Sequence, residues 1–95
     1  MAAKEEFSKA VRAELDELRG EIGRVQNRAE EAEGEARDRL QSQVGMLLTK
    51  FERVEQRMEE LEGAEGESWR DVKGKVEGAL SDLNRSVRNV LAPLA

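Results

Sequence analysis

The fold is decided by residues 15–36, which read LDELRGEIGRVQNRAEEAEGEA. Apolar side chains recur in this segment every three or four residues. Such spacing places them on one face of an α-helix, whereas a half-buried strand would alternate apolar and polar residues. The same spacing extends from Phe7 to Leu61. It predicts one long amphipathic helix over about residues 4–62.

The long predicted helix ends in a turn over residues 63–67, because glycine readily takes the left-handed conformation that closes a helix. A serine that precedes an acidic residue by three positions, just before an apolar run, follows the capping-box pattern. This pattern predicts the start of a second helix over about residues 68–92. The residues that define the turn and the cap are Gly63, Gly66, Ser68 and Asp71.

These elements predict an all-α fold, with residues 1–95 forming a single domain. Its architecture would be a helical hairpin or coiled coil whose two arms differ in length. The shorter arm would cover the longer one only from about Leu40 onward, which leaves the first half of the apolar face bare. A bare apolar face of that length needs a cover, and a second copy of the same chain is the commonest one. We therefore expect a homodimer or higher oligomer built as a helical bundle.

The expected packing residues fall into two groups. The residues expected to form the oligomer seam are Phe7, Val11, Leu15, Leu18, Ile22, Val25, Ala29, Ala32 and Ala36. Those expected to pack within the hairpin are Leu40, Val44, Leu47, Phe51, Val54, Met58, Leu61, Trp69, Val72, Val76, Leu80, Leu83 and Val87.

Composition argues against most kinds of catalysis. The chain contains no His, no Cys and no Tyr, and 39% of its residues are charged. It therefore lacks an imidazole base, a thiol nucleophile and the usual zinc ligands, and we predict no catalytic, cofactor or metal site. The net charge of −5 disfavours nucleic acid as a partner. We recognise no secretory signal and no membrane span, so the expected location is the cytoplasm.

Two further patterns allow more than one interpretation. An acidic run is either a solvated helix end or a site for a cation or a basic partner; its members are Glu59, Glu60, Glu62, Glu65 and Glu67. Several glycines lie inside the predicted helices, on faces that point away from the apolar seam. They are either tolerated on a face without packing demands, or they keep that face thin for a neighbouring surface; these residues are Gly20, Gly23, Gly34, Gly45, Gly74 and Gly78.

Three segments resemble a family of small bacterial coiled-coil proteins, some of which are described as stress-response proteins. The segments are LDELRGEI at residues 15–22, AEEAE at residues 29–33 and MEELEGAEGESWRDVKGKV at residues 58–76. The most specific part is the turn that contains Gly66, Trp69 and Asp71. The resemblance covers about residues 15–83 and implies a cytoplasmic helical protein without established catalysis.

Three functional hypotheses follow from these observations. The first is a non-enzymatic coiled-coil protein, stress-associated in the manner of the family it resembles, that acts through self-association and protein binding. The second is an amphipathic binder of lipid or granule surfaces, like a phasin or an apolipoprotein, in which the hairpin opens. The third is an accessory subunit whose bare seam binds a helix of another protein.

Overall fold

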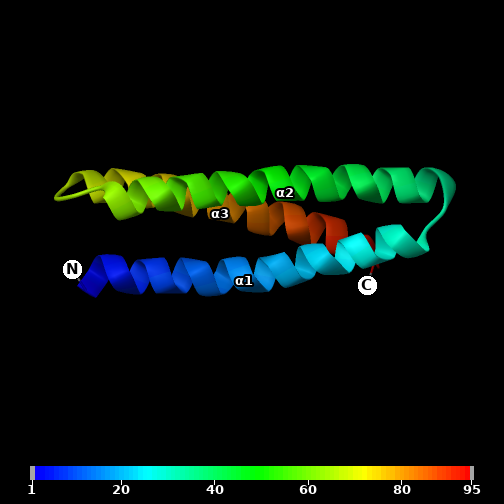
Figure 1. The fold of residues 1–95 in the computed structure, drawn as a ribbon, viewed down its shortest axis with the longest axis horizontal. Helices are drawn as coiled ribbons and strands as arrows, with labels where there is room; N and C mark the ends of the chain where they lie inside the picture. The colour runs from blue at the N-terminus through cyan, green and yellow to red at the C-terminus, as the bar shows by residue number, and fades with distance from the viewer. Residues whose placement is uncertain (1, 95) are drawn as a thin grey trace.

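The computed structural model describes residues 2–94 as three helices that lie side by side (Figure 1). No strand occurs within this range, so the described chain is all-helical. The elements are α1 (Ala2–Glu31), α2 (Gly34–Gly63), α3 (Ser68–Leu91) and a short 3-10 helix, η1 (Ala92–Leu94).

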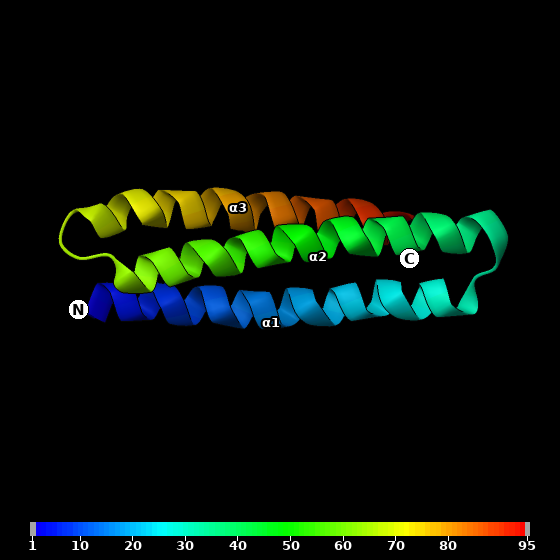
Figure 2. The same ribbon diagram turned by 45° about the horizontal axis from the view of Figure 1, so that its top comes forward.

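The three helices run up, down and up along a rod that measures 51 × 17 × 16 Å. Each helix contacts both of the others. Figures 1 and 2 show the start of α1 at the same end as the α2–α3 turn, with the α1–α2 turn at the opposite end. The bundle is therefore closed by its own chain, with α3 returning alongside both earlier helices.

The prediction of one helix over residues 4–62 is wrong. The helix stops at Glu31, and α2 starts again at Gly34 after two non-helical residues. Gly34 has a φ of 63°, a left-handed conformation that glycine adopts without a steric penalty. Periodicity alone could not reveal this break, because the apolar positions keep a helical spacing across it. Gly34 is thus a turn residue and not an outward-facing residue inside a helix.

The core lies along the axis of the rod, where one apolar stripe from each helix meets the other two. Side chains three and four positions apart share a face of a helix, so the sequence spacing itself aims these residues inward. Burying each large aliphatic side chain contributes about 1.5–3 kcal/mol. The large core residues are Val11, Leu15, Leu18, Ile22, Val25, Val44, Leu47, Val54, Met58, Leu61, Val76, Leu83, Val87 and Val90.

The turn between α2 and α3 is held by contacts from both sides. Gly66 supplies the left-handed residue, with a φ of 62°. The backbone N–H of Ala64 donates to the carbonyl of Leu61 at 3.2 Å. From α1, Lys4 Nζ donates to the carbonyls of Glu62 at 3.0 Å and Ala64 at 2.8 Å. A lysine thus satisfies carbonyl groups at the end of α2 that have no partner within the helix.

The capping box predicted at Ser68 is not formed. Ser68 is already the first residue of α3, and Glu67 occupies the N-cap position without a side-chain capping hydrogen bond. The Ser68 hydroxyl instead donates to the carbonyl of Glu65 at 2.7 Å, which stabilises the turn and not the helix start. Asp71 is exposed in the first turn of α3, where its charge is favourable to the helix dipole.

Candidate interaction surface

The residues expected to form an oligomer seam lie mostly inside a single chain. Six of them, from Val11 to Ala29, are buried against the other two helices. Phe7 is partly buried and packs on the core. Only the last two differ: Ala32 is half-buried and Ala36 is exposed. The inference that the seam is bare was therefore wrong, because the return of the chain at Gly34 lets α2 and α3 cover it.

The residues expected to pack within the hairpin line the interior of α2 and α3. Those that are buried are Val44, Leu47, Val54, Met58, Leu61, Val76, Leu83 and Val87. The remaining ones, at the margins of the core, are Leu40, Phe51, Trp69, Val72 and Leu80. Since α3 also contacts α1, this group forms one core with the seam residues and not a separate hairpin interface.

A polar cluster joins α2 to α3 at the edge of the core. Lys50 Nζ lies 2.8 Å from the hydroxyl of Ser86 and 3.1 Å from the nearer carboxylate oxygen of Asp82. Ser86 is itself buried, so this hydrogen bond satisfies a hydroxyl that water hardly reaches. The sequence offered one signal, since Ser86 falls at a helical interval between Leu83 and Val90, but spacing alone does not reveal its partner.

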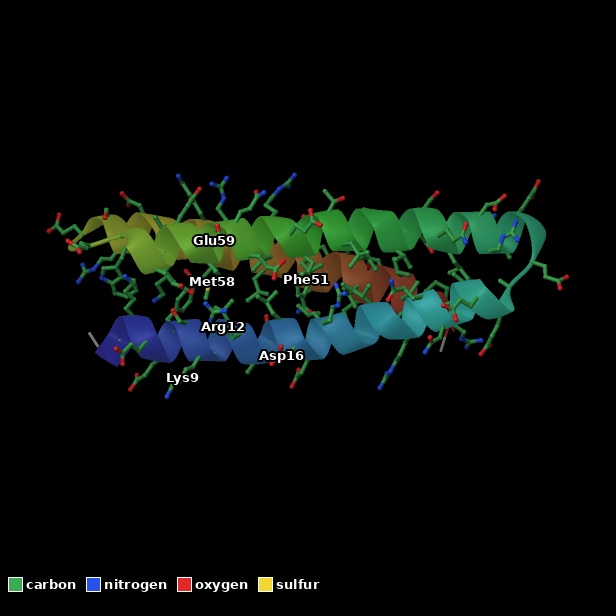
Figure 3. All side chains as sticks on the ribbon, in the orientation of Figure 1. Lys9, Arg12, Asp16, Phe51, Met58 and Glu59 are labelled. Carbon is green, nitrogen blue, oxygen red and sulfur yellow. The ribbon has the colours of Figure 1, made fainter. Side chains whose placement is uncertain are left out.

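Surface ion pairs and hydrogen bonds fasten α1 at several points along its length. Near its start, Arg12 pairs with Glu62 of α2. In Figure 3, Arg12 and Met58 lie between the two helices, whereas Lys9 points away. At the far end, Arg28 donates to the carbonyl of Leu94 at 2.6 Å. Contacts of this exposed kind typically contribute less than about 1 kcal/mol each, so the apolar core holds α1 in place.

The ion pair between Glu21 of α1 and Arg88 of α3 allows a direct test of how these helices pack. Arg88 Nη2 lies 3.1 Å from Glu21 Oε1, and a second guanidinium nitrogen contacts the other carboxylate oxygen. We expect a double-mutant cycle with Glu21→Gln and Arg88→Met to give a coupling free energy of about 0.3–1 kcal/mol that shrinks in high salt. Urea denaturation of the four proteins measures it, and a coupling of zero would contradict the pairing.

Cationic side chains cover the aromatic rings at the margins of the core. Lys73 Nζ lies 5.2 Å from the ring centre of Phe7 and 5.8 Å from that of Trp69. The Arg19 guanidinium lies 5.7 Å from the ring of Phe51. These distances are within the range of cation–π attraction. Each of the three aromatic rings, which stay partly exposed, therefore has a cationic side chain beside it.

Open clefts lie between α1 and α3, and two of them include apolar side chains. One, of about 360 Å³, has a mixed lining made of Phe7, Ala10, Val11, Glu14, Glu77, Leu80, Ser81 and Asn84. The other, of about 460 Å³, has a mixed lining of Glu21, Arg24, Asn27, Arg28, Glu31, Arg88, Leu91 and Leu94. The ridges of an additional helix can fit such a groove, and helices in bundles pack in this way. The groove between α1 and α3 is thus the candidate docking site on the closed bundle.

The acidic run around the α2–α3 turn is partly neutralised by cations that the sequence spacing did not reveal. Arg12 reaches Glu62 from α1, and Arg57 pairs with Glu60 within α2 at 3.1 Å. Among residues 2–94, no three His, Cys, Asp or Glu side chains gather in a way that could hold a metal ion. Two members of the run, Glu60 and Glu62, thus pair with basic groups of their own chain.

Comparisons with known proteins add no family assignment. No family model, curated protein or solved structure matches the chain. In the part of the chain that the structure describes, no helix is both long and apolar enough to span a membrane.

Proposed function

We propose that the protein is a non-enzymatic helical protein that acts in the cytoplasm through self-association and binding to other proteins. The observation that carries this proposal is the distribution of its apolar residues. Each helix presents a single apolar stripe, and the stripes meet in one core. Among the described residues, Met46 alone is a large hydrophobic side chain that is well exposed, at 40%. Association through these apolar stripes therefore requires one helix to leave the core, so that the stripes of the other two become available to a partner.

The resemblance of residues 15–83 to small bacterial coiled-coil proteins supports the same class of function and favours a stress-associated role. A charged exterior and an apolar core, without buried charges among the described residues, suit a protein that exchanges helix contacts, because its closed form stays dispersed until a helix is displaced. Binding to a second copy is the form of association that we favour, since an identical chain carries the same matching stripes.

A second candidate function is binding to a helix of another protein. The groove between α1 and α3 favours it, because the half-buried residues Phe7, Leu80 and Leu91 border its clefts. A fourth helix placed there would complete a four-helix bundle. Association with a lipid surface is less well supported, since such helices are rich in Lys and Arg on the polar face, and this chain carries 21 acidic against 16 basic residues.

Light scattering coupled to size-exclusion chromatography, together with vesicle flotation, distinguishes these functions. We expect a reversible dimer whose fraction rises with protein concentration, and no flotation with vesicles of neutral or anionic phospholipid. A chain that stays monomeric up to millimolar concentration would contradict self-association. Flotation with loss of the folded core, seen as a change in Trp69 fluorescence, would favour the lipid-binding function instead.

A further inference from the structure

The turn between α1 and α2 interrupts the helix, but the apolar residues keep their helical spacing of three or four positions across it. The non-helical residues are Ala32 and Glu33 alone. On either side, the positions Ala29, Ala32, Ala36 and Leu40 follow one another at intervals of three or four. If residues 32–34 were helical, the stripe of α1 would therefore continue directly into that of α2.

The α1–α2 turn is also held by fewer side-chain hydrogen bonds than the α2–α3 turn. The α2–α3 turn receives two hydrogen bonds from Lys4 and one from the Ser68 hydroxyl. At the α1–α2 turn, Glu33 occupies the N-cap position and makes no side-chain capping hydrogen bond. Glutamate is not a favoured N-cap residue, since Ser, Thr, Asp and Asn are the residues that satisfy the first N–H groups. The start of α2 thus lacks the side-chain capping hydrogen bond that commonly stabilises the start of a helix.

The residues around the α1–α2 turn favour a helix over a loop. Residues 28–40 consist mainly of Ala, Glu and Arg, which are among the strongest helix formers, and Gly34 is the one poor helix former that lies at the break. Glu30 and Glu31 lie at the end of α1, where the helix dipole disfavours negative charge. Joining α1 to α2 would remove that helix end and its unfavourable charges.

We infer that the protein self-associates by exchanging α1 between two copies, with residues 2–63 forming one continuous helix in the dimer. This inference rests on the proposed self-association and specifies its mechanism. In the dimer, α1 of each copy would pack on α2 and α3 of the other and reproduce the contacts of the closed monomer. Short connections that tie an element to its own chain invite such exchange.

The exchanged dimer would also bury Ala32 and Ala36, the two seam residues that the closed bundle leaves partly or fully exposed. Two long helices would cross antiparallel at their midpoints, near residues 29–36. Ala32 and Ala36, which are half-buried and exposed in the monomer, would then face the other copy. Their small side chains allow two helices to approach closely. Each continuous helix would be about 93 Å long, compared with 51 Å for the closed rod.

Substitutions at the turn shift the two forms in opposite directions. Gly34→Ala is expected to strengthen the dimer about six-hundredfold. At each of the two turns, alanine disfavours the positive φ of the monomer roughly fivefold and favours the continuous helix of the dimer roughly fivefold. No atom lies within 4 Å of the added methyl group, so the conformation alone is responsible. Glu35→Pro is expected to abolish the dimer, because proline is accepted in the first turn of α2 but not inside a continuous helix.

Gly45→Ala is the matched control for these variants. Gly45 lies inside α2 in both forms, and an added methyl group there also meets open space. It stabilises both forms equally, so its dimer dissociation constant should match that of the unchanged protein. Sedimentation equilibrium measures the dimer dissociation constant of the unchanged full chain and of the three variants. Equal strengthening by Gly34→Ala and Gly45→Ala would overturn the exchange mechanism.

A cross-linking experiment separates exchange from side-by-side association. The chain has no cysteine, so the double variant Arg12→Cys with Glu62→Cys carries thiols only at a contact between α1 and α2. In an exchanged dimer, a short bifunctional thiol reagent joins two chains, and a denaturing gel shows a covalent dimer. A dimer that yields only intrachain cross-links overturns the exchange but leaves self-association intact. Absence of any dimer in the unchanged protein and in Gly34→Ala contradicts both.

Discussion

Ile22→Ala is expected to lower the free energy of unfolding by about 2–5 kcal/mol. Ile22 is completely buried in the middle of α1, so the substitution leaves a cavity between three helices of the same chain. Domains of this size are stable by only about 5–15 kcal/mol, and the loss is a large part of that total. Urea denaturation followed by circular dichroism and by the fluorescence of Trp69 measures the change.

The two signals distinguish a single core from an oligomer seam. Trp69 lies at the start of α3, so a cavity in α1 shifts its transition only if α1 and α3 unfold together. At concentrations where light scattering shows a monomer, we expect both signals to show the same lowered midpoint. Glu17→Ala, an exposed change on α1, should shift the midpoint by less than about 0.5 kcal/mol. A Trp69 midpoint that Ile22→Ala leaves unchanged in the monomer would show that α1 is not part of the same core as α3.

Val76→Asp is expected to unfold the whole chain at room temperature. Val76 has no exposed surface and belongs to the stripe of α3 that faces both other helices. An isolated carboxylate at this position would lose its hydration without gaining a partner, which costs several kcal/mol on top of the lost apolar contacts. Circular dichroism should show loss of most of the helical signal, including that of α1 and α2.

The neighbouring residue provides the control for this variant. Glu77 is exposed one position along the same helix, so Glu77→Asp places the same carboxylate side chain on the solvent side without changing the net charge. We expect it to retain full helicity. Retention of a stable α1–α2 pair in Val76→Asp would show that α3 is an appendage and not part of the common core.

The fold class could be predicted from residue spacing because all three helices obey the same rule. The stripe from Phe7 to Leu61 identified the inward face of α1 and α2 before their arrangement was known, and the glycines at residues 63–67 marked the second turn. The first turn could not be found in this way. Its position depends on the conformation of Gly34, and five other glycines inside the predicted helices have no such role.

The oligomer prediction depended entirely on that missed turn. With an unbroken helix over residues 4–62, half of the seam had no cover; with a turn at Gly34, the same residues are buried within the chain. The hydrogen bonds and ion pairs between helices could not be predicted from residue spacing either, since Lys4 and Arg12 contact partners about 50 to 60 residues away in the sequence. Contacts between distant segments depend on how the helices are arranged, which a single-helix pattern does not encode.

The distance between spin labels at Asp16→Cys and Glu59→Cys tests the three-helix bundle most directly. Both positions are exposed, one on α1 and the other on α2 (Figure 3). Pulsed electron resonance of the labelled chain, mixed with unlabelled chain at a total concentration where sedimentation shows a monomer, reports the distance within one closed monomer. Helices packed side by side have axes 8–10 Å apart, so the account predicts a distance of about 20–30 Å. A single distance near 65 Å, the length of 43 residues in one continuous helix, would contradict it.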